Sequence, residues 1–208
     1  LMYTNNSSSS LYPNSFADAF DDGTNFPTYG GISRNAAGNT AFKGQYINLG
    51  SGTFSQSTIG FTRASMSKLL AYVTDRAGGE APTFVVMSPG DYATLNADFI
   101  ANEQQFVNPG SSGYSMDTAV RSSFPNLNVS GVPIFADHFC PAGSVFGVNV
   151  KYTAMYLSED AAFDFSGFYS LVPLGQIGQQ GVVVCGYNLI TAKSVSGFYG
   201  YGLLGAAF

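Results

Sequence analysis

A helical pattern, an apolar strand pattern and a second helical pattern follow one another directly between residues 58 and 99, and this order constrains the fold more than any other feature. The first pattern predicts one long amphipathic helix over residues 58–77, with Thr58 or Thr62 as its N-cap and Gly78-Gly79 as its end. Its apolar residues recur at helical spacing: Met66, Leu69, Leu70, Val73 and Ala77. A helix with one apolar face has to lie against a core.

The strand and the second helix come next. Residues 83–87 form a short apolar run that is typical of a buried strand. Ser88 then supplies an N-cap, Pro89 suits the first helical turn, and Asp91 stands where a capping box has its carboxylate. The apolar face of this second helix comprises Tyr92, Leu95 and Phe99. The segment is therefore predicted to be a strand–turn–helix unit.

Most of the remaining sequence predicts β-structure, because glycine or proline separates short β-prone runs. The strand candidates are residues 43–49, 132–136, 144–148, 152–157, 163–165, 181–186 and 189–195. Residues 104–123 lack periodicity and predict an exposed loop with a short helix at Asp117–Arg121. Residues 197–205 have the composition of a low-complexity tail. The predicted fold class is mixed α/β or α+β.

Charged residues are scarce. They make up 10% of the 208 residues, against about 25% in typical domains. The 8 Lys+Arg and 13 Asp+Glu leave a net charge of −5, which argues against nucleic-acid binding through a basic surface. No apolar run is long enough for a membrane span. A lone soluble monomer usually carries more charge than this. The scarcity of charged residues therefore indicates a surface that other subunits cover or that consists of uncharged polar residues.

The only histidine lies in the segment Asp137-His138-Phe139-Cys140-Pro141, the best candidate for catalytic chemistry. A histidine activates a cysteine thiolate only when a third group orients it. Zinc needs four ligands with paired spacing, and this segment supplies at most three. We therefore interpret it as a structural turn with Asp137 as a backbone acceptor, and Cys140 and Cys185 as reduced thiols.

Two carboxylate pairs, Asp21-Asp22 and Glu159-Asp160, stand beside turn residues and are interpreted as solvated turns. Gly50-Ser51-Gly52 is similar to the beginning of a phosphate loop, but it lacks the Lys-Ser/Thr ending and a preceding buried strand. No catalytic, cofactor-binding or metal-binding residue is predicted, no cofactor is expected, and the chain is not expected to be an enzyme.

Several segments, taken together in their order and spacing, resemble those of a known protein family, although each motif alone is weak. These segments are Tyr29-Gly30-Gly31-Ile32-Ser33-Arg34, the long helix, Gly78-Gly79-Glu80-Ala81-Pro82, Thr83-Phe84-Val85-Val86-Met87-Ser88-Pro89, Asp91-Tyr92, Gly131-Val132-Pro133-Ile134-Phe135-Ala136-Asp137, Cys140-Pro141-Ala142-Gly143 and Asn149-Val150-Lys151-Tyr152. From Tyr29 to about Leu203, the chain resembles the major capsid protein of tailed bacteriophages, of the Hong-Kong-ninety-seven type.

The resemblance implies a subunit with a peripheral (P) domain and an axial (A) domain. The P domain would hold a long spine helix and a sheet, and the A domain a sheet flanked by helices. It divides the chain into an N-terminal segment (1–28), a P domain with the spine helix at about 58–77 (29–80), an A domain (81–176), and return strands to the P domain with a C-terminal tail (177–208). Fewer than thirty residues precede Tyr29, too few for the N-terminal arm and extended loop of the family. Most of both is therefore expected to be missing, through truncation or proteolytic removal.

The implied function is that of a structural subunit of an icosahedral phage capsid, which self-assembles into hexamers and pentamers around double-stranded DNA. The partners would be copies of itself, with portal, scaffolding and decoration proteins, and with packaged DNA contacted only non-specifically; no membrane is involved. The location would be the virion capsid, assembled in the host cytoplasm. Two alternatives stay open, an encapsulin-like nanocompartment shell and a secreted β-rich adhesion module, and the latter predicts a Cys140–Cys185 disulfide.

Overall fold

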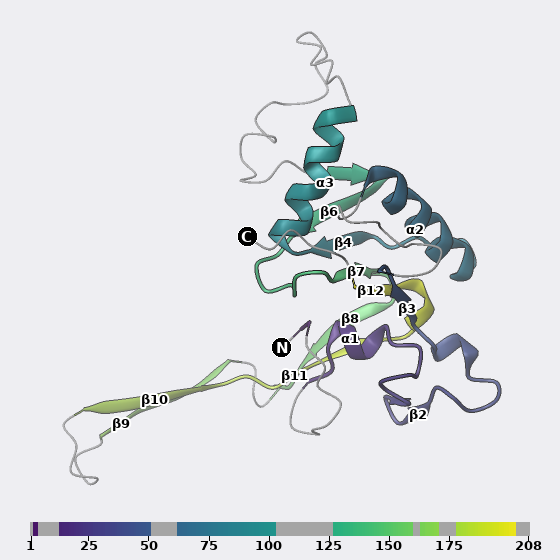
Figure 1. The fold of residues 1–208 in the computed structure, drawn as a ribbon. Coiled ribbons are helices and arrows are strands. Elements are labelled where there is room, and N and C mark those ends of the chain that lie inside the picture. The colour runs from purple at the N-terminus through teal and green to yellow at the C-terminus, as the bar shows by residue number, and fades with distance from the viewer. Residues whose placement is uncertain are drawn as a thin grey trace, which may run out of the picture.

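The computed structural model describes residues 2–3, 13–50, 62–102, 127–159, 163–170 and 178–202, with backbone only for residues 99–102. The described chain forms a sheet-rich body and a narrow β-arm that runs away from it (Figure 1). The helices are α1 (Phe16–Ala19), α2 (Arg63–Arg76) and α3 (Pro89–Asn102), with 3-10 turns η1 (Thr40–Phe42) and η5 (Ser194–Ser196). The strands are β1 (Thr28–Tyr29), β2 (Ile32–Ser33), β3 (Gln45–Asn48), β4 (Phe84–Met87), β5 (Leu127–Val129), β6 (Val132–Ala136), β7 (Val145–Val148), β8 (Thr153–Leu157), β9 (Asp164–Ser170), β10 (Gln179–Val184), β11 (Tyr187–Thr191) and β12 (Phe198–Tyr201).

The body is built on a mixed six-stranded sheet with the strand order β3-β12-β7-β4-β6-β5. The pairs β12–β3 and β4–β6 are parallel, whereas β12–β7, β4–β7 and β5–β6 are antiparallel. Elements from both ends of the chain therefore share one sheet, and mixed sheets of this size are common.

Both faces of this sheet are covered, as the alternation of side chains in β4 shows. Val85 and Met87 belong to a core that α2 and α3 cover, together with Met66, Leu69, Leu70, Val73, Leu95, Val145 and Phe198. Val86 belongs to a second core on the opposite face of the sheet, which α1 covers. This core also contains Phe16, Phe20, Phe146, Val148 and Leu189. The body thus has three layers: two long helices, the sheet, and α1 with its flanking segments (Figure 1).

Helix α2 confirms the predicted apolar face and, of the two predicted N-cap residues, has Thr62. Thr62 has extended backbone and its side chain accepts a hydrogen bond from Ser65 N–H, so the helix begins at Arg63. At the other end, Gly78 and Gly79 have positive φ, and Gly79 N–H donates to Thr74 C=O. Glycine ends the helix because only it adopts this conformation without strain.

The predicted start of α3 is confirmed. Ser88 Oγ accepts a hydrogen bond from Asp91 N–H, and the Ser88 hydroxyl donates to Asp91 Oδ2. The same carboxylate oxygen accepts a bond from Gly143 N–H at 2.9 Å. Asp91 therefore also ties the turn before β7 to the helix. Residues 104–123, including the short helix predicted at Asp117–Arg121, lie outside the described residues.

The expectation of a low-complexity tail over residues 197–205 is wrong for its described part. Phe198–Tyr201 form β12, which lies between β3 and β7 in the sheet. Phe198 is fully buried and stands opposite Gly147 of β7, where an added Cβ would lie 2.1 Å from its ring. The glycine and aromatic residues are complementary packing partners, and composition alone conceals this relation.

The interpretation of Asp21 as a solvated residue is also wrong. Its carboxylate is buried and accepts hydrogen bonds from Gly23 N–H, Asn25 N–H and Phe26 N–H. Beside it, the fully buried Arg34 side chain donates to four backbone carbonyls, those of Asp18, Ala19, Phe26 and Phe42. Burial lowers the Arg34 pKa, and the nearby Asp21 carboxylate partly offsets this effect.

The described part of the arm consists of two antiparallel pairs, β8–β11 and β9–β10. β8 follows β7 after a short turn, and β11 leads through η5 into β12, so the arm is an excursion from the body sheet. The division into parts at residues 28, 80 and 176, with α2 as a spine helix, stays a prediction.

Candidate functional site

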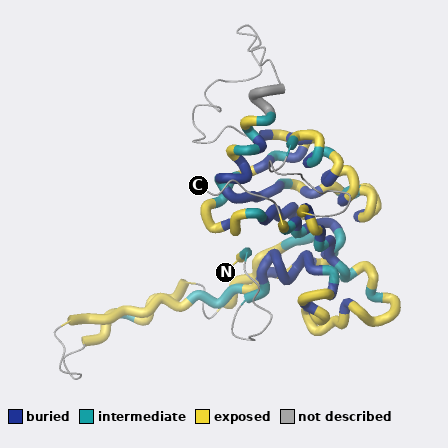
Figure 2. The backbone as a smooth tube through the Cα atoms, in the orientation of Figure 1, coloured by how far each residue is buried: buried dark blue, intermediate teal, exposed yellow. Residues whose placement is uncertain are grey.

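The arm is the most exposed part of the described chain and one of its most apolar parts. Figure 2 shows that most of its length is exposed, whereas the strands of the body are mainly buried. Phe168 is 70% exposed, Val183 61% and Tyr169 53%. Further exposed apolar residues of the arm are Met155, Tyr156, Leu157, Phe163, Phe165, Val182, Val184 and Ile190. Large contiguous apolar surfaces on a soluble protein mark interaction sites.

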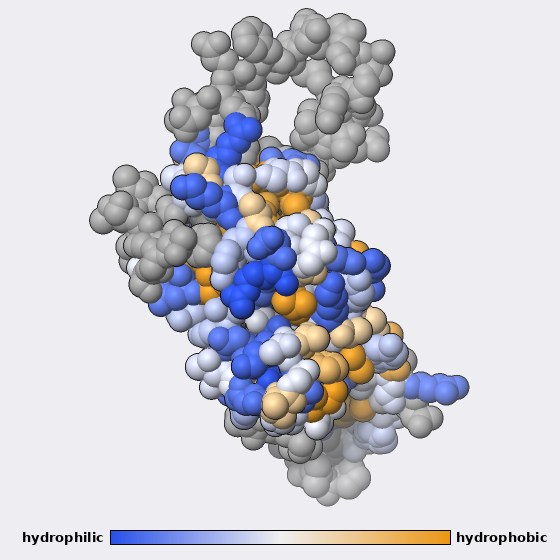
Figure 3. Space-filling model, turned by 90° about the vertical axis from the view of Figure 1, so that its right-hand side faces the viewer, coloured by the Kyte–Doolittle hydropathy of each residue, from blue (hydrophilic) through white to orange (hydrophobic). Residues whose placement is uncertain are grey.

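Charge is almost missing from the arm. Residues 153–191 contain Glu159, Asp160 and Asp164 and no Lys, Arg or His. Soluble proteins usually place lysine or proline on exposed strands to prevent edge pairing. The side of the body seen in Figure 3 has hydrophilic and hydrophobic residues interspersed, as on an ordinary surface. The arm surface is therefore suited to a protein partner and unsuited to phosphate groups.

The outer part of the arm is a twisted pair with an irregular register. Phe168 pairs with Gly181 and Phe165 pairs with Val183, so the register shifts between Gly181 and Val183. Gly167, at φ 79, accommodates the shift. The Phe165 and Phe168 rings meet edge to face at 5.1 Å, and an added Cβ on Gly181 would lie within 3.3 Å of both. Two aromatic rings covering a glycine hold this otherwise isolated pair together.

The root of the arm is fixed to the body by hydrogen bonds, and those of Tyr29 are buried. The Tyr29 hydroxyl donates to Leu189 C=O and accepts a bond from Thr191 N–H. Asn14 N–H donates to Asn188 Oδ1, and its side-chain amide donates to Leu189 C=O. Burial raises the pKa of Tyr29, so this hydroxyl stays protonated and keeps both bonds.

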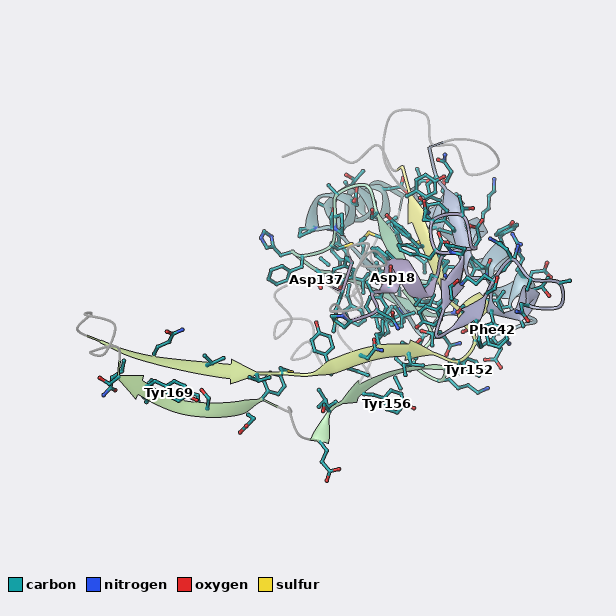
Figure 4. The ribbon with its side chains drawn as sticks, turned by 90° about the horizontal axis from the view of Figure 1, so that it is seen from below. Asp18, Phe42, Asp137, Tyr152, Tyr156 and Tyr169 are labelled. Carbon is teal, nitrogen blue, oxygen red and sulfur yellow. The ribbon has the colours of Figure 1, made fainter. Side chains whose placement is uncertain are left out.

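A second contact fixes the root from the other side. Glu80 Oε1 accepts hydrogen bonds from the Tyr152 hydroxyl at 2.6 Å and from Lys151 Nζ at 3.0 Å. These donors lower the pKa of the Glu80 carboxyl, the Tyr152 bond most and Lys151 next. In Figure 4, Tyr152 lies where the arm meets the body, Tyr156 part of the way out and Tyr169 toward the far end.

The segment around His138 has the geometry of a turn. Asp137 Oδ1 accepts a bond from Phe139 N–H, which confirms the predicted role of backbone acceptor, and Asp137 Oδ2 accepts one from the Tyr3 hydroxyl. The Cys140 thiol is buried and donates to Ser144 C=O at 3.6 Å. Burial, followed by the charges of Asp137 and Asp91, raises the pKa of the Cys140 thiol to about 12. A reactive thiolate needs the opposite shift.

The other candidates are not brought together with this segment. Asp21 serves the loop before β1, and Glu159 is exposed at the end of β8. Asp160 and residues 51–52 of the glycine-rich stretch lie outside the described residues. Cys140 and Cys185 are both free, so the disulfide expected for an adhesion module is not formed. Within the described ranges, no His, Cys, Asp and Glu side chains group as metal ligands, and no helix is long and apolar enough to cross a membrane.

The sequence did not predict that the strands of the arm form an exposed apolar surface. All four of its strands overlap strand candidates from the sequence, but their exposure was not foreseen. One signal was present: residues 153–191 contain no basic residue although they hold many apolar ones.

Comparison with known proteins gives structural likeness only. No family model matches the chain, and no curated protein matches it in sequence. Among solved structures, the chain is similar to the capsid asymmetric unit of cyanophage A-1(L), with 14% identity and a TM-score of 0.53, over 88% of this chain and 58% of that one. It also matches the holo-SrpI encapsulin complex from Synechococcus elongatus PCC 7942 at 12% identity and a TM-score of 0.47, over 78% and 54% of the two chains. The chain thus spans somewhat more than half of each of these proteins, and it shares its mixed α/β fold with a phage capsid protein.

Proposed function

We propose that this chain is a structural subunit that associates with copies of itself to form a closed protein shell. The observation that carries the proposal is the fold shared with the cyanophage capsid protein over 88% of the chain. A shell subunit needs surfaces that are apolar and uncharged while it is free, because its neighbours cover them in the assembly. The exposed arm is a surface of this kind.

The finer proposal is a phage capsid, in which α2 acts as the spine helix and hexamers and pentamers enclose double-stranded DNA. Its place would be the virion, after assembly in the host cytoplasm, with portal, scaffolding and decoration proteins as further partners. The net charge of −5 supports contacts with DNA that are non-specific at most. Heterologous contacts that close into rings are the symmetry such a shell requires.

The proposed role is structural and not enzymatic. The histidine and cysteine that formed the best catalytic candidate belong to a turn whose hydrogen bonds serve the backbone. The raised pKa of Cys140 supports the same view, because a thiol at ordinary pH is a poor nucleophile.

The test is the native mass of the purified chain, measured by light scattering on a sizing column, with negative-stain images of each peak. We expect rings of five or six copies or closed shells. A chain that stays monomeric at every concentration would contradict the proposal. A phage capsid and a cellular nanocompartment are then distinguished by the contents of the purified particles, nucleic acid in the first and protein cargo in the second.

A further inference from the structure

The outer edge of β10 has backbone groups that no described strand pairs with. β10 belongs to a two-stranded sheet with β9 alone. Val182 N–H points toward β9, where it donates to Ser166 Oγ at 3.2 Å. Successive residues of a strand direct their backbone groups to opposite sides, so those of Gly181 and Val183 point away from β9. These groups form a template for another strand.

This edge also lacks the features that normally prevent pairing. Residues 179–184 contain no charge and no proline, and three consecutive valines end the strand. β9, in contrast, carries Asp164, and Gly167 at φ 79 interrupts its regular geometry. Pairing through β10 is therefore favoured over pairing through β9.

We propose that β10 pairs antiparallel with β10 of a second copy of this chain, around a two-fold axis at Val183. Two arms then form one four-stranded sheet that bridges two subunits. This inference rests on the proposed function, because it needs subunits that associate.

A second copy fits this edge better than a partner of different sequence. A two-fold contact uses the same patch on both subunits, and an uncharged strand meets itself without like-charge repulsion. The absence of Lys and Arg from residues 153–191 disfavours a nucleic acid.

The valines fix the register. With the axis at Val183, this residue faces its own counterpart on one side of the sheet, and Val182 faces Val184 of the second copy on the other side. An axis at Gly181 would instead put glycine opposite glycine and Gln179 opposite Val183. Cross-strand pairs of β-branched residues stabilise a sheet, so the register at Val183 buries the most apolar surface.

The test is a disulfide across the axis. Val183→Cys is made in a Cys185→Ser background, with the buried Cys140 retained, and the full chain is exposed to mild oxidation. Opposed residues of a hydrogen-bonded antiparallel pair have Cα atoms about 5.5 Å apart, inside the range for a disulfide. We expect a covalent dimer on a non-reducing gel. The matched control is Gln179→Cys, also exposed, whose two copies would lie about 26 Å apart at about 3.3 Å per residue.

A second pair of variants tests the contact without new covalent bonds. Val183→Lys places two like charges at the axis. It should raise the protein concentration at which half of the assemblies dissociate by at least about tenfold. Val183→Thr should change this concentration by less than about threefold. Native mass is measured for every variant. Assemblies that form without cross-linking at Val183, or with equal cross-linking at Gln179, overturn the β10 contact and leave the shell proposal standing. A chain that is monomeric throughout overturns both.

Discussion

The body and the arm contain the same kind of strand, but the strands are mainly buried in the body and mainly exposed in the arm. β7 (Val145–Val148) and β10 (Gln179–Val184) are both short and rich in valine, yet every residue of β7 is buried and every residue of β10 is exposed. In the body, helices cover one face of the sheet and α1 covers the other. In the arm, no described element covers either face of the β9–β10 pair. Apolar content therefore identifies strands, but the surrounding elements decide whether a strand serves stability or association.

The sharpest test makes the same substitution in both regions. Phe198→Ala removes a fully buried ring between β3 and β7, whereas Phe168→Ala removes a ring that is 70% exposed. We expect Phe198→Ala to lower the free energy of unfolding by about 3–5 kcal/mol. Phe168→Ala should lower it by at most about 1.5 kcal/mol, the scale of its edge-to-face contact with Phe165, while it weakens assembly. Urea unfolding followed by circular dichroism, on dilute protein, measures both. Equal losses would show that the arm is part of the stable core.

The two cysteines provide a second comparison between the regions. Cys140 is buried in the body, and Cys185, half-buried, follows β10. The rise of the Cys140 pKa from 9.0 to about 12 lowers its thiolate fraction near neutral pH by about a thousandfold. We expect iodoacetamide to label Cys185 and to leave Cys140 unlabelled at pH 8, as mass spectrometry of the peptides would show. Faster labelling of Cys140 than of Cys185 would reopen the catalytic interpretation.

A third prediction concerns the complementarity of Gly147 and Phe198. Gly147→Ala puts a Cβ 2.1 Å from the Phe198 ring and should cost about 1–3 kcal/mol of stability. In the Phe198→Ala background the same change should cost much less, because the clash is gone. The unmodified chain and the three variants of this cycle are compared by urea unfolding. Additive losses would mean that the two residues do not interact.

This pair of residues also shows where sequence analysis succeeds and fails. The helix face from Met66 to Ala77 was predictable, because a spacing of three and four residues reports a local periodicity. β12 was not predictable, because Gly200 and Phe198 pack against residues such as Leu49 and Gly147, which lie far away along the chain. Local patterns encode elements, and packing between distant elements leaves no local signal.

The same limit applies to Asp21 and to the arm. A carboxylate beside glycine in sequence is usually solvated, and Asp21 is buried because the loop that follows folds its N–H groups around it. The strands of the arm were predictable from β-branched and aromatic residues, but their exposure depends on the absence of covering elements. The missing basic residues over 153–191 were the one local sign of an unusual surface.

A fourth prediction tests the buried side of the arm root. Tyr29→Phe removes a hydroxyl that accepts a bond from Thr191 N–H, and this donor would remain buried without a partner. We expect a loss of about 1–3 kcal/mol in unfolding free energy. Tyr169→Phe, in the exposed part of the arm, is the matched control and should be neutral. Hydrogen exchange at Thr191 N–H should accelerate in the first variant only. If neither variant changes it, the root is held by other contacts.

The smallest effect is expected at the exposed side of the root, where its sign follows from the pKa of Glu80. The hydrogen bond from Tyr152 and the contact with Lys151 lower this pKa in the folded chain. The carboxylate therefore stabilises the fold above the pKa of an unfolded glutamate, about 4.3, and this contribution is lost as the pH falls through the lower, folded value. Glu80→Gln keeps an acceptor for Tyr152 but removes the titration, so its stability should vary less than that of the unmodified chain in acid. Tyr152→Phe removes the largest cause of the shift and should flatten the same curve in part. Unfolding free energies measured from pH 3 to pH 7 compare the three proteins, and identical curves would mean that Glu80 does not contribute to holding the arm on the body.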